Sequence, residues 1–248
     1  MAARTVLVTG GAKRLGAAIV RRLAADGHRL IIHYGRSVHE AAALADEIGG
    51  AGIVGGDLHR LDAIDELWSR ARKVAGGPID GLVNSASLFV FDRPEAVDID
   101  LAAQLYAVNC TAAVLLAQSL YQQGVGGAVV NLLDQKVANP NPDFFSYTLA
   151  KQALAAATTL MAQAFAPTVR VNAVSPGLTL ASGDQTAAEF NTVACKNLLE
   201  RPVGAEAVAD AVAYLIGAES VTGQNLFVDN GQRFLKRDGD VMFEGRGQ

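Results

Sequence analysis

The fold is decided near the start of the chain by the stretch Thr5-Val6-Leu7-Val8-Thr9-Gly10-Gly11-Ala12-Lys13-Arg14-Leu15-Gly16. Its apolar start shows no polar alternation, which is typical of a parallel strand that is covered on both faces. The glycines that follow allow a tight turn, and apolar residues then recur at helical spacing from Leu15 to Leu23. Together they predict a strand, a turn and a helix that ends near Gly27, the opening unit of an α/β fold.

The same alternation continues along the chain. Strands are predicted at about 30–32, 53–54, 79–83, 128–133, 169–174 and 226–228, and helices at about 39–48, 64–67, 101–121, 147–165 and 205–216. This order predicts a Rossmann-like, doubly wound parallel sheet that binds ligands at the carboxyl ends of its strands.

We expect one α/β domain over residues 1–232 and a C-terminal tail over 233–248. Residues 178–189 lack clear periodicity and follow a strand end, so a substrate-covering loop is expected at about 178–200. The tail is also aperiodic, and we expect it to form a partner-subunit contact or to be disordered.

Composition limits the class of protein. The chain has 248 residues, 50% of them apolar, and a net charge of −4, which suits one α/β domain and gives no reason to expect nucleic acid as a partner. Cys110 and Cys195 stand at no metal-ligand spacing, so reduced thiols and no metal are expected. No signal peptide or uninterrupted apolar run of ~18 residues stands out, so a cytoplasmic protein without a membrane partner is expected.

The glycine-bearing turn indicates a dinucleotide site. Its glycines would let the backbone approach a pyrophosphate, and the free N–H groups at the helix start would point at the phosphate oxygens. A purely structural turn is the alternative, but this turn lies between a first strand and a first helix, as the motif requires. Arg14 stands where a middle glycine is usual, so its side chain is expected at the cofactor or substrate mouth; a solvated arginine is the alternative.

The end of the second strand indicates which dinucleotide is bound. An acidic residue there would accept hydrogen bonds from a ribose 2′-hydroxyl, but the chain reads His33-Tyr34-Gly35-Arg36-Ser37. Arg36 and Ser37 offer a cation and a hydroxyl, which suit a 2′-phosphate, so NADP(H) is favoured over NAD(H). Asp57, after the third strand, could accept a hydrogen bond from adenine or cap a turn.

Tyr147 and Lys151 lie four residues apart on a predicted helix, so their side chains share one face. A phenol is a poor acid or base near neutral pH, and a nearby ammonium favours its phenolate form. Such a pair is usually structural, but the glycine-bearing turn and Asn109 favour a functional interpretation.

These features together resemble the short-chain dehydrogenase/reductase family over nearly the whole chain. The matching motifs are Thr9-Gly10 to Gly16, Asp57, Asn84-Ser85-Ala86-Ser87, Asn109, Tyr147-Thr148-Leu149-Ala150-Lys151, Pro176-Gly177, and Thr222-Gly223 with Asp229. The resemblance implies that Tyr147 donates a proton, that Lys151 lowers the pKa of Tyr147 and holds the nicotinamide ribose, and that Asn109 anchors a proton-relay water. It also implies a homotetramer with the helices near 101–121 and 147–165 paired, while a dimer stays open.

The same resemblance assigns the cofactor site. Its residues would be Gly10, Lys13, Arg14, Leu15, Gly16, Tyr34, Arg36, Ser37, Asp57, Leu58, Asn84, Ser85, Ala86, Tyr147, Lys151, Pro176 and Gly177.

Asp134 departs from the family pattern, which usually has a serine at this position. Hydride attack on a ketone develops negative charge on its oxygen, and an ionised carboxylate would oppose that charge. A carboxylate suits instead a substrate with N–H groups, or a C=N bond whose nitrogen gains a proton. With Arg14 and the 33–37 stretch, Asp134 therefore resembles the pteridine reductase branch, which reduces pterins and folates with NADPH.

That branch implies a substrate site in which Phe89 stacks on the pterin, Ser87 contacts the pterin or a cofactor phosphate, and Phe144 forms a second wall; either phenylalanine could be plain core. The full set is Arg14, Ser87, Phe89, Asp134, Phe144, Tyr147 and Leu178. If Asp134 were protonated it could donate as a serine does, and the enzyme would be an NADPH-dependent ketone or 3-oxoacyl reductase. A catalytically silent NADP-binding protein is a third possibility, which the retained Tyr147, Lys151 and Asn109 disfavour.

Overall fold

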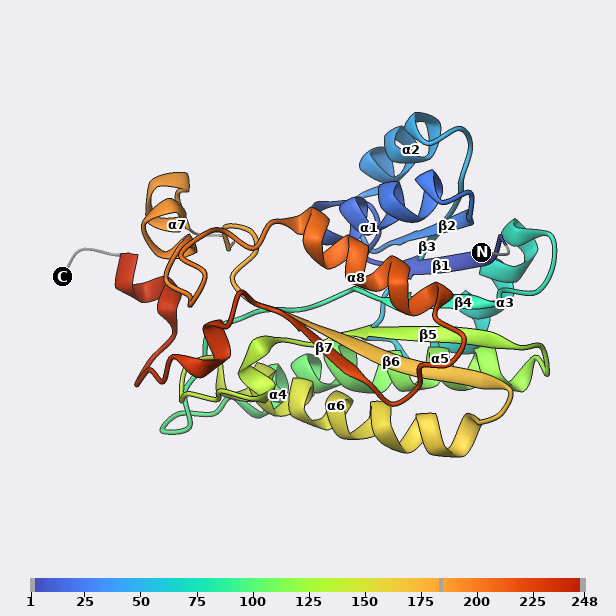
Figure 1. Ribbon diagram of the computed structural model, residues 1–248. Helices are drawn as coiled ribbons and strands as arrows, with labels where there is room; N and C mark the ends of the chain where they lie inside the picture. The colour runs from blue at the N-terminus through green and yellow to red at the C-terminus, as the bar shows by residue number, and fades with distance from the viewer. Residues whose placement is uncertain (1–2, 183–184, 246–248) are drawn as a thin grey trace.

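A computed structural model describes residues 3–182 and 185–245. Among these residues, seven strands form one parallel sheet in the order β3-β2-β1-β4-β5-β6-β7, with helices on both faces (Figure 1). The strands are β1 (Thr5–Thr9), β2 (Arg29–Tyr34), β3 (Gly52–Gly55), β4 (Gly81–Asn84), β5 (Gly127–Leu132), β6 (Val169–Pro176) and β7 (Asn225–Val228). The chain winds outward from β1 to one edge and from β4 to the other, which confirms the predicted doubly wound sheet.

Two apolar layers cover the sheet. Val6 and Val8 of β1 face the layer of α1 (Arg14–Ala25), α2 (Val38–Glu47) and α8 (Ala205–Gly217). Leu7, between them, faces the layer of α3 (Ile64–Ala75), α5 (Ala112–Gln122) and α6 (Phe145–Phe165). Successive side chains of a strand point to opposite faces, so the uninterrupted apolar strands follow from burial on both sides.

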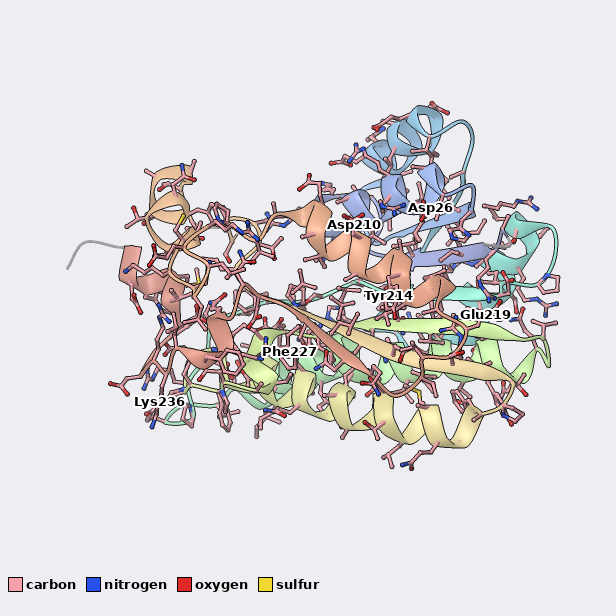
Figure 2. The ribbon with its side chains drawn as sticks, in the orientation of Figure 1. Asp26, Asp210, Tyr214, Glu219, Phe227 and Lys236 are labelled. Atoms are coloured by element: carbon pink, nitrogen blue, oxygen red, sulfur yellow. The ribbon has the colours of Figure 1, made fainter. Side chains whose placement is uncertain are left out.

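Helices α1 and α8 lie side by side on the first face (Figure 2). Arg22 of α1 pairs with Asp26 and donates to Asp210 of α8 at 2.6 Å. These ion pairs are exposed and each contributes little to stability. The buried Val20, Leu23 and their apolar neighbours on α8 supply most of the attraction.

The helix that the sequence predicts over 101–121 is interrupted. It consists of α4 (Ile99–Tyr106), a π-helical turn at Ala107–Thr111, and α5. A π-helical turn inserts an extra residue and often marks a functional site; here it carries the buried Asn109. Within the described residues, Ile99–Gln122 is also the one helical stretch long and apolar enough to cross a membrane, a composition that core helices share.

The two aperiodic stretches are more ordered than the sequence indicates. The predicted loop at 178–200 contains α7 (Ala187–Ala194), which begins with a capping box between Thr186 and Glu189. Disorder is the wrong expectation for tail residues 233–245, because they pack on their own chain and end in a 3₁₀ turn, Val241–Gly245, against α7 (Figure 1). Residues 183–184 of the loop and 246–248 of the tail lie outside the described residues.

Candidate active site

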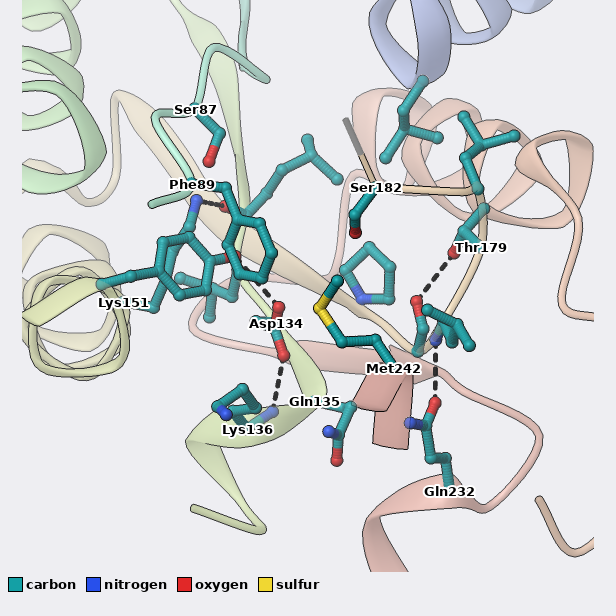
Figure 3. A pocket seen from close by; sticks show the side chains of 18 of the residues that line it. Ser87, Phe89, Asp134, Gln135, Lys136, Lys151, Thr179, Ser182, Gln232 and Met242 are labelled. Atoms are coloured by element: carbon teal, nitrogen blue, oxygen red, sulfur yellow. Dashed lines mark hydrogen bonds between the residues drawn. The ribbon is translucent and has the colours of Figure 1, made fainter. Parts of the chain in front are cut away.

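A pocket of about 410 Å³ opens where the strands of the central sheet end (Figure 3). Its wall combines the turn before α1, the loop after β4, the turn after β5, α6, the loop after β6 and the C-terminal tail. The predicted site residues on this wall are Arg14, Leu15, Ser85, Ser87, Phe89, Asp134, Tyr147, Lys151, Pro176, Gly177 and Leu178. Residues from both ends of the chain therefore meet in one cavity.

The turn before α1 has the features of a phosphate-binding turn. Gly10 adopts a left-handed φ of +61°, and a Cβ on Gly16 would lie 2.2 Å from the Gly10 carbonyl oxygen, so neither position accommodates a side chain. Lys13 caps the helix without a side-chain hydrogen bond among the described residues, and the first turn of α1 carries no acidic residue. The N–H groups at the start of α1 are thus left for an anion, and the turn fits a pyrophosphate.

His33 fixes this turn, a role that the sequence did not indicate. The Gly10 N–H donates to His33 Nδ1 at 3.2 Å, so the other ring nitrogen, Nε2, carries the proton and donates to the Gly56 carbonyl at 3.2 Å. Burial lowers the pKa of His33 to about 4, so the ring is neutral above mildly acidic pH. A histidine inside an otherwise apolar strand is the signal that could have revealed it.

The end of β2 presents polar groups to solvent. Arg36 is exposed, and Ser37 caps α2 without a side-chain hydrogen bond among the described residues, so both stay available to a ligand. Lys13 instead pairs with Glu40 of α2 at 2.5 Å. Tyr34 is half-buried and its ring packs over Gly55.

Other predicted cofactor residues have structural contacts. Asp57 accepts the His59 N–H at 3.0 Å, which is the turn-capping alternative, and Leu58 is buried. Asn84 donates to Asn131 at 2.9 Å and so joins β4 to β5. Ala86, like Ser85, donates its N–H to the Thr9 hydroxyl, which holds the loop after β4 against the dinucleotide turn.

Asn109 braces the substrate side of that loop. Its amide donates to the Leu88 carbonyl at 2.8 Å and to the Leu105 carbonyl at 3.0 Å. Its oxygen accepts the Ser87 hydroxyl at 2.8 Å. The side-chain amide of Asn109 is therefore fully engaged in fixing Ser87 and Leu88, two residues before Phe89.

Asp134 and Tyr147 form a direct pair in the pocket. The Tyr147 hydroxyl donates to Asp134 Oδ2 at 2.9 Å, and the Lys136 N–H donates to Asp134 Oδ1 at 2.8 Å (Figure 3). Burial raises the pKa of Asp134 above its usual value. Burial and the adjacent carboxylate also raise the pKa of Tyr147 well above its usual value.

The raised pKa of Tyr147 is opposite to the effect expected from Lys151. Lys151 Nζ donates to the Leu132 carbonyl at 2.7 Å and lies 5.7 Å from the centre of the Tyr147 ring, whereas Asp134 touches the phenol oxygen. The nearer carboxylate therefore outweighs the ammonium. Burial lowers the pKa of Lys151 itself to about 8.

Phe89 supplies the aromatic wall. Its ring is partly exposed, stacks on Phe144 at 4.0 Å between centres, and meets Tyr147 edge-on at 4.8 Å. Phe144 is buried and is absent from the described pocket wall, so it lies behind Phe89 and does not form the expected second wall. One face of Phe89 is thus supported and the other is left for a ligand.

The C-terminal tail completes the pocket, which the sequence did not indicate. Asp240, Val241 and Met242 line the wall together with Gln232 (Figure 3). Gln232, the residue just before the tail, also accepts the Leu178 N–H at 2.8 Å and so holds the start of the tail at the loop after β6. A short apolar run, Val241-Met242-Phe243, within a charged tail is the signal that could have indicated a buried segment.

Comparisons with known proteins place this architecture in a family. The family described as "Enoyl-(Acyl carrier protein) reductase" matches residues 10–233. The chain belongs to the short-chain dehydrogenase/reductase family. This membership confirms the resemblance drawn from the motifs and the expected class of oxidoreductase.

Several members of the family are similar over nearly their whole length. The chain is 32% identical to 3beta-hydroxysteroid dehydrogenase 1 of Eggerthella lenta, covering 92% of this chain and 93% of that protein. It is 30% identical to pteridine reductase 1 of Leishmania tarentolae, covering 92% and 96%. FolM alternative dihydrofolate reductase 1 from Brucella canis, solved with NADP, is 40% identical with a TM-score of 0.90 over 96% and 97%. The Brucella suis enzyme, also solved with NADP, is 41% identical with a TM-score of 0.89 over 94% and 96%.

Proposed function

We propose that this protein is an NADPH-dependent reductase of pterin-type substrates, of the dihydropteridine or dihydrofolate class. The observation that carries the proposal is the 2.9 Å hydrogen bond from Tyr147 to Asp134 inside the pocket. In this pair, the Tyr147 phenol can give a proton to a ring nitrogen. The Asp134 carboxylate can accept hydrogen bonds from ring N–H groups. The NADP-bound FolM structures and the pteridine reductase relative support the same substrate class.

The residues around the first turn suit NADPH, which supplies the hydride when it is bound. The start of α1 would hold the pyrophosphate, and Arg36 with Ser37 would hold the 2′-phosphate. No acidic residue ends β2, so no carboxylate there would repel the 2′-phosphate. Lys151 would hold the nicotinamide ribose from the floor of the pocket.

Proton delivery follows from the pair geometry. A raised pKa keeps the Tyr147 phenol protonated across the neutral range, so the donor is loaded before each turnover. Asp134 holds the phenol hydroxyl in the pocket by accepting its hydrogen, and that hydroxyl would turn from Asp134 to the ring nitrogen when a substrate binds. When the proton leaves, negative charge develops on the phenol oxygen, and the Lys151 ammonium on the same helix face offsets that charge.

Ring orientation would come from Phe89 and the acceptors near it. Phe89 is held by Phe144 and offers its free face to a flat heterocycle. The Ser87 hydrogen is given to Asn109, so the Ser87 oxygen can accept an N–H from the ligand. Arg14 donates to the Ala181 carbonyl at 2.5 Å, which ties the dinucleotide turn to the loop after β6 at the pocket mouth.

A specific observation favours the alternative, an NADPH-dependent carbonyl reductase. Burial raises the pKa of Asp134, and a protonated carboxyl could donate to a substrate carbonyl as a serine does. The hydroxysteroid dehydrogenase relative acts, by its name, on an alcohol or ketone.

NADPH oxidation with a panel of acceptors separates the two functions. We expect turnover with dihydrobiopterin or dihydrofolate and little with acetoacetyl thioesters. Asp134→Ser should lower pterin turnover by about 10²-fold, the usual contribution of a positioned acid or base. Asp210→Ser, an exposed change on α8, is the matched control. Unchanged pterin turnover in the Asp134 variant, or turnover with the thioester alone, would defeat the pterin assignment.

We also propose that the chain is a cytoplasmic homotetramer built through α5 and α6, with the tail 233–248 acting as part of one functional unit with residues 1–232. Tyr121 on α5 and Leu149 and Leu160 on α6 are large apolar side chains left exposed on the single chain. The cysteines are free, with Cys110 buried and Cys195 exposed, as suits a reducing compartment. Light scattering after size exclusion should give four chains, and Leu160→Arg should reduce that number.

A further inference from the structure

Lys136 is an unusual residue in the wall of this pocket. Its side chain is 2% exposed, and its ammonium donates to Asn141 Oδ1 at 2.7 Å, to the Asp143 carbonyl at 2.9 Å and to Asp240 Oδ2 at 3.1 Å. A buried lysine loses its hydration, so all of its donors need partners, and here the three partners come from two segments. Nothing in the proposed chemistry so far uses this charge.

The partner Asp240 belongs to the C-terminal tail. Its N–H donates to Asp143 Oδ2 at 2.7 Å, and its Oδ1 accepts the Met242 N–H at 3.1 Å. Asp143 in turn pairs with Arg93 at 2.7 Å. These bonds place Met242 in one buried cluster with Tyr147 and Phe144. The ion pair of Lys136 and Asp240 therefore fastens the tail where it forms the pocket wall.

Lys136 also contacts the pair of Asp134 and Tyr147 that delivers the proton. Its backbone N–H donates to Asp134 Oδ1 at 2.8 Å, while Asp134 Oδ2 accepts from Tyr147. One residue thus connects the tail, through its side chain, with the carboxylate, through its backbone.

We propose that Lys136 is a positioning residue that locks the C-terminal tail over the substrate through Asp240 and holds Asp134 as the acceptor of a substrate N–H group. This inference rests on the proposed pterin-type function. A carbonyl reductase would gain nothing from a cation that favours an ionised carboxylate at this position. A pterin-type ring, with its N–H groups, needs that acceptor.

The charges that face Asp134 act in opposite directions. Lys136 favours the ionised carboxylate and lowers the pKa of Asp134, whereas Asp240 disfavours it and raises that pKa. From α6, the Tyr147 hydroxyl donates to the carboxylate, and Lys151, whose pKa is lowered to about 8 by burial, supplies a second cation. If a neutral contact replaced the ion pair of Lys136 and Asp240, the tail could still be held, but a smaller fraction of Asp134 would be ionised.

The experiment compares Lys136→Met, Asp240→Asn and the double variant in the full-length protein. The ionisation of Asp134 is followed by carboxyl ¹³C NMR titration of the unliganded protein, with Asp134→Asn used to assign the signal. Lys136→Met should move the Asp134 midpoint to higher pH because a favourable cation is lost. Asp240→Asn should move it to lower pH because a repelling carboxylate is lost, and the double variant should lie between.

Kinetics supply the second readout. With dihydropterin, Lys136→Met should lose about 10- to 100-fold in kcat/KM, the scale of a misplaced reactive group. The acid limb of its pH profile should move to higher pH, and that of Asp240→Asn to lower pH. Lys196→Met is the matched control: it removes another ion pair of the tail, the 2.8 Å contact with Glu244, at an exposed site away from Asp134. It should leave the Asp134 midpoint unchanged.

The outcomes separate this inference from the proposed function. Shifts in the same direction, or no shift in folded variants, overturn the role of Lys136 even if pterin turnover is present. If the Asp134 midpoint shifts in opposite directions in the two single variants but the wild type does not turn over any pterin, the positioning role of Lys136 stands and the proposed substrate class is wrong. If Lys136→Met does not fold because Asp240 is left buried and unpaired, the double variant is compared with Asp240→Asn instead. Equal Asp134 midpoints in the double variant and in Asp240→Asn would overturn the proposal.

Discussion

The cofactor end and the substrate end of this pocket are built in different ways. The phosphate-binding part of the cofactor end lies within residues 10–37, and it uses backbone N–H groups, a helix start and glycines at fixed places in one strand–turn–helix unit. The substrate end gathers side chains from Ser87 to Met242, brought together by contacts between segments far apart in the chain. Local geometry produces the first end, and long-range packing produces the second.

This difference predicts that the two ends can be altered separately. The tail and the loop after β6 are joined to each other by Gln232, the residue just before the tail, with Leu178 and by Lys196 with Glu244 of the tail. They touch the dinucleotide turn mainly through Arg14 and Ala181. Changes in the tail should therefore affect the pterin-type substrate more than NADPH.

The largest effect should come from the residue at the junction of the two ends. Tyr147→Phe removes the proton donor but keeps the ring that meets Phe89. We expect kcat with dihydropterin to fall by about 10²- to 10⁴-fold, the range of general acid–base catalysis. Fluorescence titration should show NADPH affinity changed by no more than about twofold, since no cofactor phosphate contact is lost. A kcat that stays within tenfold of wild type would remove Tyr147 from the proton step.

We expect low pH to destabilise the cofactor end first, because His33 becomes protonated there. Its pKa is lowered from the usual 6.5 to about 4, so the unfolded chain binds the proton more readily than the folded one. The contribution of His33 to the free energy of unfolding is therefore fully present above pH 6.5. It is lost as the pH falls toward 4, by about 3 kcal/mol in total at 1.36 kcal/mol per pH unit. Urea unfolding at stepped pH measures this slope.

Two variants test whether His33 causes that acid sensitivity. His33→Gln, whose amide can still accept from Gly10 and donate to Gly56, should flatten the stability profile between pH 6.5 and 4. His39→Gln, at an exposed position on α2, should leave it unchanged. If the stability of His33→Gln falls as steeply with pH as that of the wild type, groups other than His33 cause the acid sensitivity.

Removal of the tail should affect the substrate end alone. A chain that ends at Leu235 lacks Asp240, Val241 and Met242 from the pocket wall. We expect KM for dihydropterin to rise by about 10- to 100-fold, because the ring loses one wall and Tyr147 loses a packing neighbour. The NADPH dissociation constant should stay within about twofold. A matched loss of NADPH affinity would contradict the separation of the two ends.

The same contrast explains what could be predicted from the sequence. The succession of strands and helices along the chain and the turn at Gly10 follow from local signals, since apolar runs and glycine spacing are fixed by burial and backbone geometry. Asp134 and Tyr147 are brought together as the spacing of family motifs implies. The tail and Lys136 carry no periodicity, because their positions depend on side-chain bonds to residues as much as 104 positions away.

Two features of the site differ from one of the expectations, the first for an electrostatic reason and the second for a packing reason. The pKa of Tyr147 is raised by burial and then by Asp134, which accepts its hydroxyl hydrogen while Lys151 lies farther away, and the sequence spacing of 13 and 4 residues cannot rank these distances. The resemblance implies that Phe144 forms a second pocket wall, and plain core is the alternative. The left-handed backbone of Phe144, with φ of 55°, instead turns the ring into the cluster behind Phe89.

The smallest expected effect tests the outer part of the cofactor end. Arg36 is exposed, and the Ser37 side chain makes no capping hydrogen bond within the described residues. Their contact with a 2′-phosphate would therefore be partly solvated and charge-assisted, and would contribute about 1.5 kcal/mol to binding. Arg36→Ala should therefore reduce the preference for NADPH over NADH by about tenfold while leaving kcat with saturating NADPH near wild type. Arg60→Ala, which breaks an equally exposed pair with Asp62, is the control and should not change the preference. If Arg36→Ala weakens NADPH and NADH equally, Arg36 contributes only general positive charge, and the 2′-phosphate must be recognised by other groups at the end of β2.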